Sequence, residues 1–93
     1  MNYLTIIAVN PMTGTEFRDW GVKIQNYFSG FSKVTCDLSA GRVTGKQRGY
    51  VPRFRLQGNE HDIFESIKAF APAPLPMDPF EIFGVEVYTG DLI

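Results

Sequence analysis

The chain alternates between segments with the two-residue apolar period of strands and segments with the three-to-four-residue period of helices. An apolar, β-branched run from Tyr3 to Val9, closed by Asn10-Pro11, predicts a strand buried on at least one face and mostly on both. Thr13 and Glu16 then have the spacing of a capping box, in which two side chains bind free backbone N–H groups reciprocally. The pattern therefore predicts a strand followed closely by the start of a helix.

Two segments have helical periodicity. The first predicts an amphipathic helix of about four turns that ends near Gly30. Its apolar positions are Phe17, Trp20, Ile24, Tyr27, Phe28 and Phe31. Asn59 is placed to cap a second, shorter helix that ends near Phe70. Prolines recur between residues 71 and 76, so this segment is predicted to be an extended, stiff connector.

Further strands are predicted from alternation of polar and apolar residues. The segment from Lys33 to Leu38 predicts a half-buried strand, and Ala40-Gly41 a turn after it. Another strand is predicted from Tyr50 to Leu56. Because Pro52 lacks the N–H that a sheet ladder requires, we expect a bulge or an irregular start there. The last strand is predicted from Ile82 to Thr89.

The predicted order is strand, helix, strand, strand, helix, strand. Right-handed crossovers would bring the first strand beside the third and place both helices on one face. The expected fold class is therefore α+β, a ferredoxin-like βαββαβ sandwich with a four-stranded antiparallel sheet and one open face. The length of 93 residues fits a single domain, residues 1–93.

Composition agrees with an ordered domain and limits its chemistry. With 44% hydrophobic residues and a net charge of −1, the chain lacks the signature of disorder. Cys36 is the only cysteine and His61 the only histidine, which excludes an internal disulfide and leaves too few ligands for a structural zinc site. We expect no metal and no cofactor. No secretory signal is visible and the first apolar run is too short to cross a bilayer, so the expected location is cytoplasmic.

Catalytic and nucleotide-binding patterns are weak. His61 lies between Glu60 and Asp62 at the start of the second helix, where a solvated polar residue is expected, and no orienting group or nucleophile accompanies it. The segment from Ala40 to Gln47 resembles a phosphate-binding loop only superficially, because it lacks the first glycine and the final hydroxyl and precedes a strand. We therefore assign no catalytic residue and expect a protein that is not an enzyme.

The third predicted strand begins with Arg48-Gly49-Tyr50, which agrees with the first three positions of a strand motif in the RNA-recognition fold. In that fold the aromatic residues of the motif stack on bases. The following positions of this chain, from Val51 onward, depart from the motif, so membership of that family is not inferred.

The charge map is more informative than any motif. From Lys33 to Arg55 six basic residues face one acid, Asp37, for a net charge of +5, whereas the segment from Glu60 to Asp91 has a net charge of −6. A basic hairpin of this kind suits phosphates or a complex that contains nucleic acid. The candidate binding residues are Lys33, Arg42, Lys46, Arg48, Tyr50, Arg53 and Arg55. Arg53 and Arg55, two apart on one strand, would point the same way and could contact successive phosphates.

The first strand is largely apolar on both of its faces, so one set of its side chains is expected on the open sheet face, where an apolar strip marks a partner interface. The candidate interface residues are Tyr3, Ile7 and Tyr88.

The leading hypothesis is a non-enzymatic binding protein whose basic hairpin engages a nucleic acid or a ribonucleoprotein complex, of the kind that phages and mobile elements use as inhibitors, such as anti-CRISPR proteins. The alternatives are a structural or regulatory homodimer that pairs open sheet faces and a small dimeric ferredoxin-like enzyme.

Overall fold

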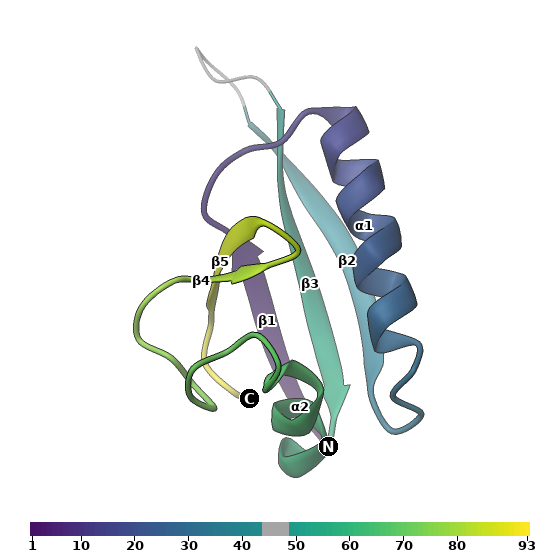
Figure 1. The fold of residues 1–93 in the computed structure, drawn as a ribbon, viewed down its shortest axis with the longest axis vertical. Coiled ribbons are helices and arrows are strands. Elements are labelled where there is room, and N and C mark those ends of the chain that lie inside the picture. Colours follow the sequence, from purple (N-terminus) through teal and green to yellow (C-terminus); the bar gives the residue numbers. More distant parts are fainter. Residues whose placement is uncertain (44–48) are drawn as a thin grey trace.

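A computed structural model describes residues 1–43 and 49–93 of the chain. In chain order the elements are β1 (Asn2–Ala8), α1 (Gly14–Phe28), β2 (Thr35–Val43), β3 (Gly49–Gly58), α2 (Glu60–Ile67), β4 (Phe80–Ile82) and β5 (Val85–Thr89). The strands form one sheet in the order β2-β3-β1-β5-β4, and every neighbouring pair is antiparallel (Figure 1). The fold is therefore α+β, with two helices and a five-stranded antiparallel sheet. The longest helix has 15 residues, and no helix among the described residues has the length and apolar character needed to cross a bilayer.

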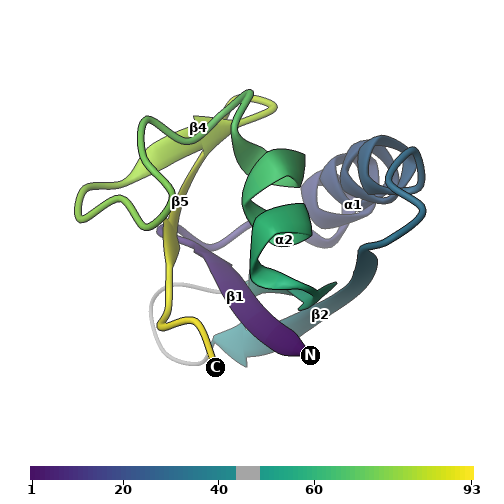
Figure 2. The same ribbon diagram turned by 90° about the horizontal axis from the view of Figure 1, so that it is seen from below.

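The sheet is covered on one face only. Figure 2 shows α1 and α2 together on one side of β1, β2 and β3, and the β4–β5 hairpin curling toward the same side. The expected pairing of the first strand with the third is confirmed, because β1 and β3 align from Asn2↔Gly58 to Ile7↔Arg53. The core lies between the sheet and the helices. Its residues that are at most 1% exposed include Leu4, Ile6, Ile24, Phe28, Phe54, Leu56, Ile63, Ile67, Ile82 and Val87.

The prediction of four strands is wrong, because the segment predicted as one last strand folds back on itself. Phe83 (φ 49°) and Gly84 (φ 79°) both have positive φ and form the two-residue turn of a hairpin in which Ile82 pairs with Val85. Glycine adopts this conformation without strain, but phenylalanine in it is unusual. Because Phe83 also continues the apolar alternation, the sequence pattern concealed the turn.

The cap of α1 follows the prediction. The Glu16 N–H donates to the Thr13 hydroxyl and the Thr13 N–H to the Glu16 carboxylate, both at 3.1 Å. α1 then runs across the sheet and comes close to β2 at Gly21, where a Cβ atom would lie 2.5 Å from Cδ2 of Leu38. Asn59 is the N-cap residue of α2, although its side chain makes no capping hydrogen bond.

The β2–β3 hairpin is longer and more regular than predicted. Its register is unbroken from Thr35↔Gln57 to Val43↔Gly49, so the expected turn at Ala40-Gly41 and the expected bulge at Pro52 are both wrong. The hydrogen bonds next to Pro52 explain why no bulge forms there. Tyr50 exchanges two hydrogen bonds, of 2.7 and 2.8 Å, with Met12 on the β1 side of β3. Because backbone groups alternate in direction along a strand, the Pro52 nitrogen also faces that side, where the β1 ladder has ended at Ile7↔Arg53 and no N–H is required.

Candidate binding surface on the open sheet face

The face of the sheet opposite the helices, called the open sheet face below, is formed by alternate residues of β1, β2, β3 and β5. Strand β3 shows the alternation most clearly. Phe54 and Leu56 are fully buried against the helices, whereas Arg53 and Arg55 between and beside them are exposed. The predicted division of this strand into an apolar and a basic side is therefore confirmed. Two arginines thus lie at the middle of a sheet face that no helix covers (Figure 2).

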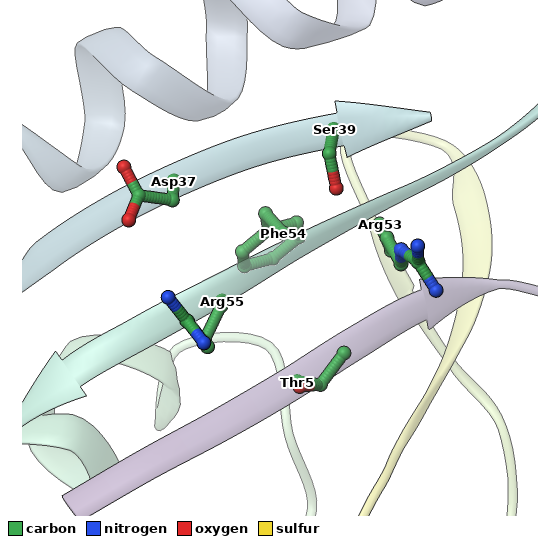
Figure 3. Close-up of a pocket in the computed structure, with 6 residues that line it drawn as sticks. All are labelled: Thr5, Asp37, Ser39, Arg53, Phe54 and Arg55. Carbon is green, nitrogen blue, oxygen red and sulfur yellow. The ribbon is translucent and has the colours of Figure 1, made fainter. Parts of the chain in front are cut away.

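Cross-strand pairing gives each arginine one neighbour on β1 and one on β2. Arg55 pairs with Thr5 of β1 on one side and with Asp37 of β2 on the other. Arg53 pairs in the same way with Ile7 and Ser39, two residues further along each strand. Directly paired residues in a sheet share a face. These two rows enclose a shallow depression of about 390 Å³, and Figure 3 shows its lining residues: Thr5, Asp37, Ser39, Arg53, Phe54 and Arg55.

The two arginines have no acidic partner in the described part of the chain. The ion pairs found there involve other residues, Arg18 with Asp19 and Lys68 with Glu65, all on the helices or beside them. The Arg55 guanidinium instead lies over the ring of Tyr3, with its Cζ 4.9 Å from the ring centroid. This cation–π contact holds Arg55 in place without neutralising it. Both positive charges therefore remain available to a ligand.

The candidate interface residues belong to the same surface. Tyr88 of β5 pairs with Ile7 of β1, which in turn pairs with Arg53 of β3, so the three form one cross-strand row. Tyr88 is 43% exposed, while Tyr3 and Ile7 are half-buried. The structure thus unites two sets that the sequence had treated separately, the pair Arg53 and Arg55 and the trio Tyr3, Ile7 and Tyr88.

Other predicted residues lie elsewhere. Tyr50 packs edge-on against Phe17 of α1, with 6.1 Å between ring centroids, so it is on the helix side of the sheet. Arg42 pairs with Tyr50 and therefore shares that side. Lys33 lies just before the start of β2 at Thr35, at the end of the strand far from Arg42. Lys46 and Arg48 lie outside the described residues. The basic hairpin is consequently divided, with Arg53 and Arg55 on the open sheet face and Arg42 on the other.

Apart from the arginines, the polar residues of the depression are Thr5, Asp37 and Ser39, and the sequence pattern did not single them out as binding residues. Asp37 and Ser39 are the polar positions of the alternation in β2, and that pattern signals that they share a solvent-facing side. Nothing in the pattern indicates that Asp37 comes opposite Arg55, since this depends on the register of the β2–β3 hairpin.

The cysteine and the histidine of the chain lie outside the depression. Cys36 is half-buried on the helix side of β2, and burial together with the neighbouring Asp37 carboxylate raises the pKa of its thiol to about 11. His61 is exposed in the first turn of α2. Over residues 1–43 and 49–93, no three His, Cys, Asp or Glu side chains are grouped so that they could hold a metal ion. The depression itself offers guanidinium and hydroxyl donors and one carboxylate acceptor, which are groups suited to binding.

No protein-family model matches this sequence, and no curated protein is significantly similar to it.

Proposed function

We propose that the protein is a non-enzymatic binding protein whose open sheet face engages a nucleic acid or a ribonucleoprotein complex. The observation that supports this is the pair Arg53 and Arg55, exposed side by side on a central strand and free of ion pairs within the described residues. Guanidinium groups bind phosphate through charge and paired N–H donors. The hydroxyls of Thr5 and Ser39 line the same depression and add neutral donors.

The proposal includes a fold assignment and a cellular role. The strand order β2-β3-β1-β5 supports a ferredoxin-like plan in which β5 is the fourth strand and β4 is added at the edge. We place the protein in the cytoplasm, where a domain of this size can act by occupying a surface of a larger complex. We therefore propose the role of a phage or mobile-element inhibitor of the anti-CRISPR type, by analogy of size and chemistry.

The binding proposal can be tested by fluorescence anisotropy with labelled oligonucleotides, single- and double-stranded, at 50 and 200 mM salt. We expect binding that the double variant Arg53→Glu, Arg55→Glu weakens strongly. Loss of two phosphate contacts from a single strand should lower the salt slope by about 1.4, which makes binding about sevenfold less sensitive to this change in salt. If the double charge reversal leaves too little binding to measure, the salt slope is measured instead on the double variant Arg53→Gln, Arg55→Gln.

The matched control reverses two exposed charges on α1, with Arg18→Glu and Lys23→Glu. It alters the net charge equally but leaves the open sheet face intact, so its binding should stay close to that of the wild type. Equal losses in the two double variants would reduce the effect to net charge alone and would contradict the proposal.

A second candidate function, a homodimer that pairs open sheet faces, is favoured by the exposed ring of Tyr88 beside Ile7, with Tyr3 further along the same face of β1. Sedimentation velocity over a range of protein concentrations tests it. A dimer should dissociate in Tyr88→Lys and persist in Val22→Lys, which places the same charge on an exposed apolar position of α1. A wild type that is monomeric throughout would exclude this candidate.

A further inference from the structure

The carboxylate of Asp37 is the one acidic group that lines the depression with the two arginines. Asp37 is exposed and stands directly opposite Arg55 in the β2–β3 ladder, yet the two side chains form no ion pair. Figure 3 shows the Asp37 carboxylate on β2 and the Arg55 guanidinium on the neighbouring strand β3. Arg55 instead lies over Tyr3. Among the described residues, the depression therefore presents one carboxylate and two guanidinium groups that form no ion pair.

This combination disfavours a ligand that offers only phosphate groups. A carboxylate repels phosphate and accepts hydrogen bonds, so its complement is a group with N–H donors. The Watson–Crick edge of guanine carries two neighbouring donors, N1–H and the 2-amino group, which match the two oxygens of a carboxylate. Uracil and thymine have a single N–H between two carbonyl oxygens, and a carboxylate would face those oxygens unfavourably.

The Watson–Crick edge is accessible only when the base is unpaired. In a duplex this edge is engaged with the opposite strand, and reading the groove edges requires an element that enters a groove. The depression is instead shallow and lies on the surface of a sheet, an arrangement suited to splayed-out bases of a single strand. The planar guanidinium of Arg55, held over Tyr3, offers a surface on which a base can stack.

We infer that the ligand of this surface is a single-stranded nucleic acid containing guanine, whose Watson–Crick edge donates to the Asp37 carboxylate. Arg53 and Arg55 contact the adjoining phosphates, and Arg55 also supports the base. This inference rests on the proposed function, since it specifies the ligand of the same site. It makes Asp37 the residue that determines base preference, while the arginines supply affinity.

The test compares labelled oligouridines of equal length that carry one central guanine, one central inosine or no substitution. Inosine lacks only the 2-amino group of guanine, so it removes one of the two donors. We expect the guanine strand to bind at least about fivefold more tightly than the inosine strand. A duplex of the guanine strand should bind more weakly than the single strand. Deoxyribose versions of the three strands decide between RNA and DNA.

The variant that tests the assignment is Asp37→Asn. It should lose the preference for guanine over inosine and bind plain oligouridine at least as tightly as the wild type, because a repulsive charge is removed. Asp78→Asn, which removes an exposed carboxylate from the segment before β4, is the matched control and should retain the preference. Circular dichroism and thermal unfolding confirm that each variant is folded.

The outcomes separate this inference from the proposed function. If guanine, inosine and plain strands bind the wild type equally and Asp37→Asn changes nothing, the inference is wrong. Loss of that binding in the Arg53→Glu, Arg55→Glu variant would then still support the proposed function. If no strand and no duplex binds at low salt, the proposed function is wrong and the inference falls with it.

Discussion

The indole Nε1–H of Trp20 donates a hydrogen bond of 3.0 Å to the backbone carbonyl oxygen of Ile82, between residues 62 positions apart in the chain. Trp20 lies on the buried side of α1 and is 4% exposed, while Ile82 ends β4 just before the Phe83-Gly84 turn. This bond attaches the short β4–β5 hairpin to the helix layer, and the curling of the hairpin toward the helices brings its carbonyl within reach (Figure 2).

Replacing Trp20 by phenylalanine should destabilise the protein by about 1–3 kcal/mol, because the Ile82 carbonyl then loses its buried donor and the smaller ring leaves space in the core. Urea unfolding followed by far-UV circular dichroism measures the change in the free energy of unfolding. Val22→Ala, at an exposed position of the same helix, should change it by less than about 0.5 kcal/mol. A Trp20→Phe variant as stable as the wild type would show that the bond contributes nothing.

Glycine at position 84 is required by backbone conformation alone. A Cβ atom built there meets no heavy atom within 4 Å, but φ is +79°. Gly84→Ala should therefore cost about 1–2 kcal/mol of stability through backbone strain. Gly41 in β2 has equally open surroundings without a positive φ, so Gly41→Ala should be neutral or slightly stabilising. In thermal unfolding Gly84→Ala should lower the Tm, whereas Gly41→Ala should leave it unchanged or raise it slightly, and equal decreases would contradict this account of the turn.

The Cys36 thiol should resist alkylation in the native protein. With a pKa of about 11 in place of 9.0, its thiolate fraction at pH 8 is about a hundredfold lower than that of an unperturbed thiol. Iodoacetamide labelling followed by mass spectrometry should accordingly be about two orders of magnitude slower for native protein than for protein in denaturing urea. Similar rates in the two states would show that the thiol is not protected.

The same pKa shift predicts a loss of stability at alkaline pH. Between pH 9 and 11 the unfolded chain releases the Cys36 proton while the folded chain retains it, so folding stability falls as the pH rises through this window. Because Cys36 is only half-buried and water screens part of the effect, the loss should be about 1 kcal/mol. Because other groups titrate in this range, the measurement is the difference between wild type and Cys36→Ala in urea unfolding at pH 8 and pH 11. The two proteins should lose unequal amounts, the wild type more.

Features set by neighbouring residues could be predicted from the sequence. The Thr13–Glu16 capping box depends on residues three apart, and the basic side of β3 depends on simple alternation around Phe54. Both are confirmed because a strand or a helix imposes its period directly on the side chains.

Features set by the pairing of distant segments could not be predicted. Whether Arg55 meets Asp37 or a neighbour of it depends on hairpin register, and a shift of one residue would place Asp37 on the opposite face. The contact of Tyr50 with Phe17 likewise depends on how α1 crosses the sheet. The depression therefore emerged only with the tertiary structure, although two of its residues, Arg53 and Arg55, were identified beforehand.

The central position of β1 has a consequence for how the chain reaches its native state. β1 is synthesised well before its neighbours β3 and β5, which begin only at Gly49 and Val85. Contacts between residues so far apart in sequence slow folding, because a large loop must close before any pairing energy is gained. Until β5 has left the ribosome, the apolar strand from Asn2 to Ala8 has an open hydrogen-bonding edge. During that interval the chain is exposed to aggregation, and its yield in the cell should depend on the speed of translation and the supply of chaperones.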